Sequence, residues 1–316
     1  MGFRHLMERG RSQRTMWEGR RLAVVMPARN EAPHIGTALR TLPSEVDLVV
    51  VVDDGSTDGT VEVVKGGDHA CEVIVLQRGG QGVGAAVAMG FEHLAEALED
   101  DDLVAVMDGD AQMDPEDLLP LCRHLVAEQA DVVKGDRLAH PDVGNTMPVL
   151  RRLANRGLAV LTTLASGRRV GDAQCGFVVM RKAVLVHTNN DPIWSGYGYV
   201  NHRFIRWSRH RLRVATHPVR PVYAEETSGI RPLRFFFGVG AMFVREHHGR
   251  AVSSLASGPG RGLLSMALLS YLAGWVAAVG VASGHLPLAA LGVLPAGWLL
   301  AHALDRSAHA GGRARI

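Results

Sequence analysis

Residues 48–56 read LVVVVDDGS, a pattern typical of one strand in a mostly parallel sheet. Five consecutive apolar residues suit a strand that is buried on both of its faces. The run ends in two acids, Asp53 and Asp54, followed by the turn formers Gly55 and Ser56. Because ligands bind at the carboxyl ends of parallel strands, the two acids are candidate site residues.

Similar apolar runs alternate with helical patterns on both sides of this stretch. Helices are expected where apolar residues recur at helical spacing. The expected strands are 22–26, stopped by Pro27, then 48–52, 73–76, 103–107, 131–134 and 176–180. The expected helices are 31–42, one that Thr57 and Asp58 can cap and that runs through Lys65, 83–98, one opened by Pro115, and 149–165. This alternation predicts an α/β fold with a doubly wound, mostly parallel sheet and helices on both faces.

Charge and cysteine content narrow the functional class. The chain has 316 residues, and its net charge of +2 leaves no basic footprint, so nucleic acid is not an expected partner. Cys71, Cys122 and Cys175 are scattered and form no CxxC pair. They argue against a disulfide framework or a thiolate zinc site, and they fit a reducing compartment.

The C-terminal region reads as a membrane segment. Residues 262–281 carry no charge and are long enough to cross a hydrocarbon core of about 30 Å. A second apolar stretch, 286–304, completes a transmembrane helical hairpin. Arginines flank the pair on its outer sides, so the positive-inside rule places both ends and the large domain in the cytoplasm. A buried hairpin in a soluble protein is the alternative.

These patterns divide the chain into five parts. Ahead of the hairpin, three phenylalanines at 235–237 with Met242, Phe243 and Arg245 read as an interfacial helix or as a core segment. The parts are a basic N-terminal arm (1–20), a catalytic domain (21–232), an interfacial helix or linker (233–260), two transmembrane helices (261–305) and a cytoplasmic tail (306–316).

Three motifs could carry chemistry. In DGDAQ (108–112), Asp108 and Asp110 with the Gln112 amide suit Mg²⁺ or Mn²⁺ holding phosphate oxygens, although an acidic, solvated turn is the alternative. GGQGVG (79–84) precedes a helix and could approach a diphosphate, but it is neither a dinucleotide fingerprint nor a P-loop. In DAQCGF (172–177), the acid could orient or deprotonate an acceptor.

Six motifs in order along the chain resemble those of family 2 glycosyltransferases. They are PARNE (27–31), DDGSTDGT (53–60), QGVGAA (81–86), DGDAQMDPEDL (108–118), KGDR (134–137) and DAQCGF (172–177). The resemblance covers about residues 22–232 and looks most like the dolichol- or polyprenyl-phosphate mannose or glucose synthase branch. It implies a GT-A fold and an inverting transfer from a UDP- or GDP-sugar to a polyprenyl phosphate, with Mg²⁺ or Mn²⁺, at the cytoplasmic face of the cell membrane. It leaves a homo-oligomer open.

The resemblance also implies roles for individual residues. Pro27, Asn30, Glu31, Asp53, Asp54 and Gln81 would bind the nucleotide; Asp108, Asp110 and Gln112 would hold the metal; Arg137, Arg151 and Asn155 would hold the acceptor phosphate; Asp108, Asp110, Asp172 and Arg137 would be catalytic; and Tyr223, Glu226 and Ser228 would belong to a loop that closes over the site.

The two arginines also follow from charge. A lipid phosphate is mostly dianionic at pH 7, so it needs no strong base but does need cations that bring it beside a negative donor. Arg137 and Arg151 can supply this clamp, with Arg152 as the fallback. Surface pairing of these arginines with Asp136 and Asp142 is the alternative.

Three other functions compete. A processive polysaccharide synthase would carry Gln-x-x-Arg-Trp, and residues 203–207 read RFIRW, with Arg in place of Gln. A sugar-phosphate nucleotidyltransferase would need a basic, Gly-rich turn after the first strand, where this chain has PARNE. A non-catalytic membrane scaffold would not need DGD-x-Q and both arginines.

Overall fold

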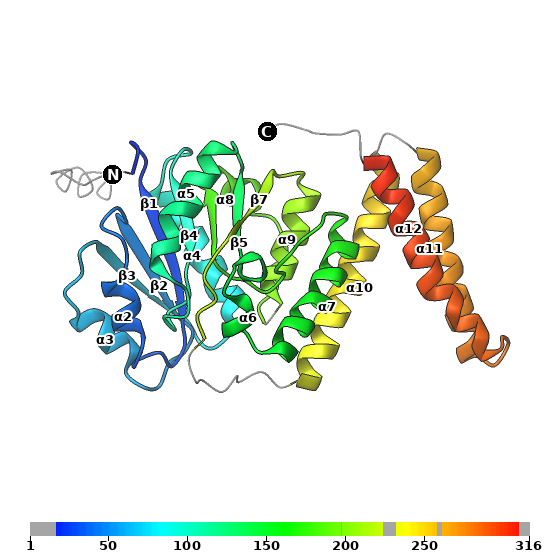
Figure 1. The fold of residues 1–316 in the computed structure, drawn as a ribbon, viewed down its shortest axis with the longest axis horizontal. Coiled ribbons are helices and arrows are strands. Elements are labelled where there is room, and N and C mark those ends of the chain that lie inside the picture. Colours follow the sequence, from blue (N-terminus) through cyan, green and yellow to red (C-terminus); the bar gives the residue numbers. More distant parts are fainter. Residues whose placement is uncertain (1–16, 197, 224–231, 258–260, 310–316) are drawn as a thin grey trace.

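The computed structural model describes residues 17–196, 198–223, 232–257 and 261–309. A seven-stranded sheet in the order β3-β2-β1-β4-β6-β5-β7 forms its centre (Figure 1). The strands are β1 Leu22–Ala28, β2 Leu48–Asp53, β3 Glu72–Gln77, β4 Leu103–Val106, β5 Val132–Asp136, β6 Val178–Arg181 and β7 Val214–Pro218. Only β6 runs antiparallel to its two neighbours among these strands, so the predicted, mostly parallel sheet is confirmed.

Helices cover both faces of the sheet. The helices of the described residues are α2 Ile35–Arg40, α3 Thr60–Gly66, α4 Val83–Ala97, α5 Leu118–Ala127, α6 Val143–Thr146, α7 Val149–Ser166, α8 Lys182–His187, α9 Tyr199–Arg209, α10 Pro232–Ser257, α11 Arg261–Ala282 and α12 Val293–His309, with short 3₁₀ turns η2 Pro115–Asp117, η3 Arg137–Ala139 and η4 Leu288–Gly292. The last two helices lie away from the sheet. Successive side chains of β1 point to opposite faces. Val24 and Met26 therefore pack with α2 and α5, while Ala23 and Val25 pack with α4, α8 and α9.

Two local expectations need correction. Strand β1 continues through Pro27 to Ala28, because Pro27 lies beyond the end of β4, where no ladder hydrogen bond needs its missing N–H. The helix expected after a Thr57–Asp58 cap begins at Thr60 with Gly59 as its N-cap residue, although the Asp58 carboxylate does accept hydrogen bonds from the Thr60 N–H and hydroxyl. Pro115 opens a 3₁₀ turn that continues into α5, in line with its expected place at a helix start.

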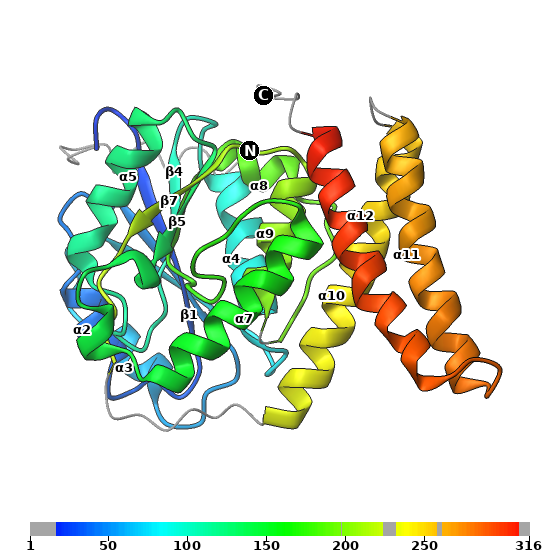
Figure 2. The ribbon, with the colours of Figure 1, turned by 45° about the vertical axis from the view of Figure 1, so that its right-hand side comes forward.

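Helix α10 packs against α7 and α9 of the sheet domain. It lies beside α7 in Figures 1 and 2, and Val239, Met242 and Phe243 are buried against Ala165 of α7 and Ile205 of α9. Met242 and Phe243 therefore belong to the core rather than to an exposed interfacial face. The side chains of residues 235–237 lie outside the described part of the structure.

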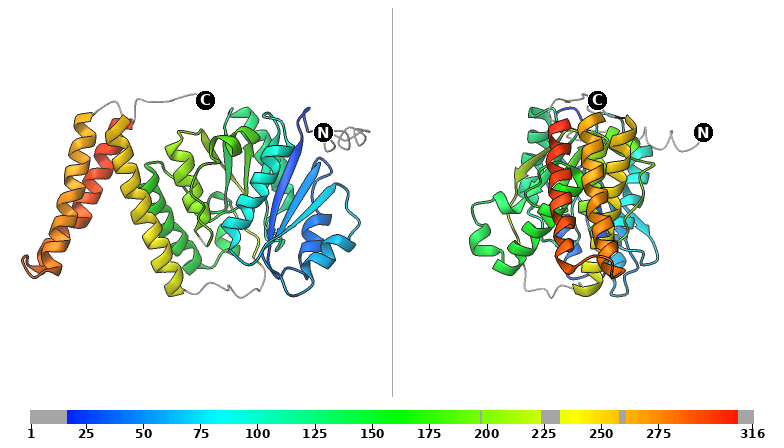
Figure 3. Two further views of the ribbon diagram at one scale, coloured as in Figure 1. Left: turned by 180° about the vertical axis from the view of Figure 1, so that it is seen from behind. Right: turned by 90° about the vertical axis from the view of Figure 1, so that its right-hand side faces the viewer.

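Helices α11 and α12 form an antiparallel pair at one end of the molecule (Figure 3). Their backbones approach closely, since a Cβ on Gly274 would lie 3.0 Å from the Leu294 Cα. Within the described residues, one helix is long and apolar enough to cross a bilayer, over Ser265–Ala282 with mean hydropathy 1.7. The apolar part of the second stretch, Leu288–Ala301, is shorter, so the helical hairpin is present but its second membrane crossing is not confirmed.

A buried carboxylate fastens α10 to α9. The Glu246 side chain on α10 is only 4% exposed, and its oxygens lie 3.1 Å from Arg209 Nη2, 3.6 Å from Arg206 Nη1 and 3.5 Å from His202 Nε2. Burial alone would raise the pKa of Glu246, but His202 and Arg209 outweigh burial and lower this pKa to about 2. The ionised form of Glu246 is therefore the form that holds the two helices together.

Glu246→Gln is expected to reduce the free energy of unfolding by roughly 3 kcal/mol at pH 7, because it removes one partner from a buried ionic cluster. The Glu246 pKa is depressed in the folded protein, so its contribution is present above about pH 4.5 and is lost as the pH falls towards 2. The difference in unfolding midpoint between wild type and variant should therefore shrink below pH 4.5. A difference that stays constant down to pH 3 would contradict this assignment.

Candidate active site

The centre of the site is a carboxylate with all its lone pairs in use. Asp172 is 1% exposed, and its oxygens accept hydrogen bonds from Arg137 Nε at 2.7 Å, Arg137 Nη2 at 3.1 Å and Asn155 Nδ2 at 2.6 Å. The backbone N–H groups of Gln174 and Cys175 add two more hydrogen bonds. Burial opposes ionisation of Asp172, but Arg137 outweighs it and holds the Asp172 pKa well below its usual range. Asp172 therefore stays ionised and fixes the Arg137 guanidinium.

The expected acceptor clamp is partly assembled around this carboxylate. Arg137 follows β5, and its side chain is 23% exposed. Arg151, exposed on α7, lies with its guanidinium carbon 4.8 Å from the centre of the Tyr223 ring and makes no ion pair with any residue that the structure describes. Arg137 pairs with Asp172, and neither arginine pairs with Asp136 or Asp142 as the alternative expected. Asn155 faces inward and orients Asp172.

The late loop is described only in part. The Tyr223 hydroxyl is buried and has no hydrogen-bond partner. Burial raises the pKa of Tyr223, while Arg137 and Arg151 act in the opposite direction, which places both cations near this hydroxyl. The remaining expected loop residues, Glu226 and Ser228, lie outside the described residues.

The two strand-end acids of DGDAQ lie beside each other, as expected. Asp108 Oδ1 is buried without a hydrogen-bond partner, while Asp110 Oδ1 accepts from the Gln112 N–H at 2.9 Å. The Gly109 N–H donates to the Pro27 carbonyl at 3.1 Å, and this bond sets the acidic turn against the end of β1. Burial, then Asp110 and Glu31, raise the pKa of Asp108 to about 7, although Arg137 opposes them.

These acids fit a divalent cation. A buried carboxylate oxygen without a partner, beside a second carboxylate, is what a cation would satisfy, and its charge would offset the repulsion that raises the Asp108 pKa. No cluster of three His, Cys, Asp or Glu that could hold a metal occurs among the residues described here. A metal at Asp108 and Asp110 would therefore need further oxygens from a ligand, which suits a diphosphate.

The expected nucleotide residues form two interlocked turns. Asp54 is buried, and its two oxygens accept from the Gln81 N–H at 2.8 Å and the Gly82 N–H at 2.7 Å. Asp54 thus holds the Gly-rich turn in place through its backbone. Asp53 is also buried, and it accepts from the Ser56 N–H at 3.3 Å. The sequence predicted ligand contacts for these two acids. In the structure, their carboxylates accept hydrogen bonds from backbone N–H groups and hold the two turns in place.

The PARNE turn closes the same edge. Asn30 adopts a positive φ of 57°, and its side-chain oxygen accepts from the Thr57 N–H at 2.9 Å. The Glu31 N–H donates to Thr60 Oγ1 at 2.9 Å. The ends of β1, β2 and β4 are therefore joined by direct contacts, and the expected nucleotide and metal residues lie along one edge of the sheet.

Three residues at this edge were not expected from the sequence. Arg78 Nε and Arg29 Nη1 lie 3.6 Å and 4.0 Å from the Asp54 oxygens and add positive charge beside the Gly-rich turn. Tyr199, at the start of α9, is buried within reach of Asp108. Arg29 lies inside a quoted motif and could have been found there, whereas no local pattern marks Arg78 or Tyr199.

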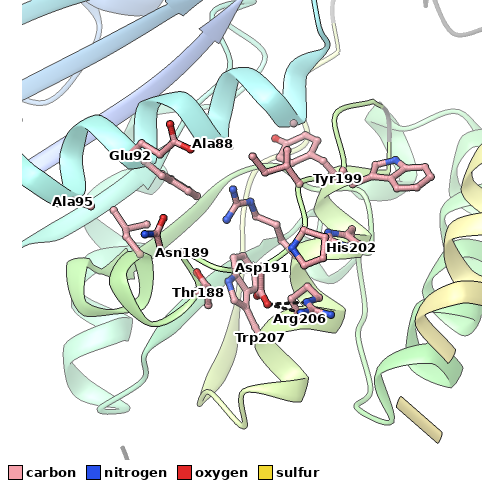
Figure 4. A pocket seen from close by; sticks show the side chains of 17 residues that line it. Ala88, Glu92, Ala95, Thr188, Asn189, Asp191, Tyr199, His202, Arg206 and Trp207 are labelled. Carbon is pink, nitrogen blue, oxygen red and sulfur yellow. Dashed lines mark hydrogen bonds and ion pairs between the residues drawn. The ribbon is translucent and has the colours of Figure 1, made fainter. Parts of the chain in front are cut away.

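A cavity of about 50 Å³ lies behind this edge, between α4, α8 and α9. Figure 4 shows Glu92 and Ala88 of α4 on one side, and Tyr199 and His202 of α9 on another. Asp191 and Arg206 pair across part of its lining. The cavity is separate from the paired acids, and Tyr199 is the lining residue that connects the two.

The fold and this edge define a GT-A glycosyltransferase. Glucosyl-3-phosphoglycerate synthase of Mycobacterium tuberculosis, in complex with Mn²⁺, UDP and glucosyl-3-phosphoglycerate, has a similar fold, with a TM-score of 0.53 and 20% identity over 73% of this chain and 81% of that one. The family model described as "Glycosyl transferase family 2" matches residues 23–187, and the chain belongs to this family.

Two archaeal relatives have more specific descriptions. A UDP-N-acetylglucosamine–dolichyl-phosphate N-acetylglucosaminyltransferase of Methanococcus voltae is 24% identical over 217 residues, covering 64% of this chain and 86% of that protein. A dolichyl-phosphate hexose transferase of Haloferax volcanii is 32% identical over 166 residues, covering 52% of this chain and 68% of that protein.

Asp108→Asn and Asp110→Asn are each expected to remove Mn²⁺ binding and abolish transfer. Because Asp108 is buried beside another acid, the Asp108→Asn variant should have the same unfolding temperature as the metal-free wild type, or a higher one. Thermal unfolding with and without millimolar Mn²⁺ measures both effects. The exposed Asp101→Asn serves as the control, and a wild-type shift that persists in either site variant would refute the metal assignment.

Proposed function

We propose that this family 2 enzyme is an inverting, metal-dependent transferase that moves a sugar from a UDP- or GDP-sugar to a polyprenyl phosphate at the cytoplasmic face of the membrane. The observation that supports it is the position of Arg137. This guanidinium influences the pKa of Asp108 on the side of the expected metal and the pKa of Tyr223 on the other side. One fixed cation is thus near both the expected metal site and the expected acceptor site.

A phosphate acceptor makes such a cation necessary. Two like charges at about 4 Å repel by roughly 4 kcal/mol at an effective dielectric constant of 20. The acceptor phosphate must approach the donor diphosphate, so positive charge between them lowers the barrier. The phosphate is already an ionised nucleophile, and a strong general base is not required.

This requirement assigns different roles to the expected residues. Asp172, with its low pKa and its full set of hydrogen bonds, is a positioning residue for Arg137 rather than a base. Arg151 has no carboxylate partner among the described residues, so its charge is available for a phosphate. When bound to Asp108 and Asp110, Mg²⁺ or Mn²⁺ supplies positive charge to the leaving diphosphate. Asp54 and Gln81 hold the turn beside that diphosphate.

The relatives support the same acceptor class. The names of both archaeal relatives specify dolichyl phosphate as the acceptor, and one specifies a UDP-sugar as the donor. The contacts of residues 203–207 do not favour the alternative of a processive synthase. Arg206 pairs with Asp191, and Trp207 is buried. The Arg203 guanidinium lies 4.5 Å from the centre of the Phe91 ring. These side chains serve the packing of α9.

Two surfaces support a membrane location. The first is the candidate span in α11. The second is a stripe on α7, where large apolar side chains are exposed at helical spacing: Val149 (61%), Leu150 (80%), Leu153 (57%), Val160 (59%) and Leu161 (41%). Arg151 and Arg156 flank this stripe and suit anionic headgroups. A lipid surface on α7 would bring the acceptor phosphate to Arg151 on the same helix.

A direct test is incubation of membranes containing the full chain with Mn²⁺, polyprenyl phosphate and a panel of UDP- and GDP-sugars, followed by mass analysis of the lipid. One glycosyl residue per polyprenyl phosphate is the expected product. A ladder of longer glycans would indicate a processive synthase, and the absence of any donor consumption would indicate a non-catalytic scaffold.

Arg151→Ala is expected to raise the KM for polyprenyl phosphate about tenfold while leaving nucleotide affinity unchanged, because it removes one charge-assisted contact. Arg151→Lys should recover part of the loss. Arg123→Ala, which removes an exposed arginine on α5, is the control. Arg137→Ala is less informative, since it leaves Asp172 buried without its cation. A change in donor KM alone would assign Arg151 to the donor side.

Leu150→Ser combined with Leu153→Ser should weaken use of a long-chain lipid in vesicles by roughly 30-fold, which corresponds to about 2 kcal/mol of lost apolar burial. A water-soluble, short-chain prenyl phosphate should be used as before. Val186→Ser, an exposed apolar residue outside the stripe, is the control. Equal losses with both acceptors would show that the stripe serves folding rather than the membrane.

A further inference from the structure

The hydroxyl of Tyr199 is a buried polar group without a partner. Tyr199 is 9% exposed, and its Oη makes no hydrogen bond. Asp108 Oδ1, just after β4, is also buried and has no hydrogen-bond partner. Buried polar atoms are rarely left unsatisfied, because each one costs about 1–3 kcal/mol. Two such atoms in one small region point to a ligand that satisfies both.

Gly176 shows that the two groups face one space. A Cβ built on Gly176 would lie 3.1 Å from Tyr199 Oη and 3.5 Å from Asp108 Oδ2. Because Gly176 has no side chain, the Tyr199 hydroxyl and the Asp108 carboxylate border the same space. A tyrosine hydroxyl carries its proton at neutral pH, so the Tyr199 hydroxyl is available as a donor.

The other end of Tyr199 reaches the Gly-rich turn. A Cβ on Gly84 would lie 2.7 Å from the Tyr199 Cβ, and the Gly84 N–H donates to the Ser195 carbonyl at 2.8 Å in the loop that leads into α9. Asp54 holds the same turn through Gly82. Tyr199 thus spans the distance from the turn beside the expected diphosphate to the acid that is expected to hold the metal.

We propose that the Tyr199 hydroxyl donates a hydrogen bond to an oxygen of the nucleotide-sugar donor at Asp108. The inference rests on the proposed function and adds a donor-binding residue to it. The donor is favoured because Tyr199 packs against Gly84 of the Gly-rich turn, and its hydroxyl lies near Gly176 and Asp108. The proposed acceptor site has a different unpartnered hydroxyl, that of Tyr223, near Arg137 and Arg151. The receiving oxygen is part of the diphosphate or of the sugar.

Tyr199→Phe in the full chain tests this inference, since it removes only the oxygen. Binding of UDP, GDP, UDP-N-acetylglucosamine and GDP-mannose is measured by titration with Mn²⁺ present, and thermal unfolding is measured without ligand. The affinity of the bound donor should fall about fivefold to tenfold. The ligand-free unfolding midpoint should stay the same or rise, because the variant loses an unsatisfied polar group.

The probes separate the two oxygens. Weaker binding of both the nucleoside diphosphate and its sugar conjugate places the bond on the diphosphate, whereas weaker binding of the conjugate alone places it on the sugar. Tyr223→Phe, which removes the matching hydroxyl on the acceptor side, should leave all four nucleotide affinities unchanged.

Two results would overturn the inference. The first is an unchanged affinity of Tyr199→Phe for every probe that the wild type binds; if the ligand-free midpoint also falls, the hydroxyl has a structural role. The second is a wild-type protein that binds none of the four nucleotides, which would refute the proposed function as well.

Discussion

The buried carboxylate of Asp172 is the constraint on which the rest of the site depends. A charge that is 1% exposed is stable only when its lone pairs are filled, and here Arg137, Asn155 and two backbone N–H groups fill them. These partners come from the end of β5, from α7 and from the loop before β6. The contacts of this one carboxylate therefore join three elements. They also fix the direction of the Arg137 guanidinium, which would otherwise be free to change its position.

The fold was largely predictable because its main signal is local. Runs such as residues 48–52 are buried on both faces, and the sequence alone shows them. Strand β7 and helix α9 were not expected. β7 is short and has only two apolar residues before Thr216 and His217, and α9 carries charged residues such as Arg206 and Arg209, whose partners lie on other elements. Glu246 pairs with Arg209 across two helices, and no spacing within either helix reveals this.

The same difference between local signals and tertiary contacts explains which features of the site the sequence could predict. Asp108 and Asp110 could be assigned to one edge of the sheet from the sequence, because the ends of parallel strands gather at one edge, which is a consequence of topology. The detailed roles of Asp54 and Asn155 depend on which backbone or side chain comes within 3 Å, and that is a tertiary property. Two adjacent acids after β2 suggest ligand contacts, yet the Gly-rich turn occupies both oxygens of Asp54. Tyr199 escaped notice for the same reason, since its neighbours Gly84 and Gly176 are distant in sequence.

The two sides of the site differ in how they are held. On the proposed donor side, Asp54, Gly84 and Tyr199 are buried, and short contacts tie Asp54 and Tyr199 to the Gly-rich turn. On the acceptor side, Arg151 is exposed on a helix whose outer face is apolar. A water-soluble donor can enter a preformed edge, whereas a lipid acceptor keeps its chain in the bilayer and presents only its phosphate. An exposed arginine beside an apolar stripe suits that second task, and in the proposed function Arg137, fixed by Asp172, is the point at which both ligands would meet.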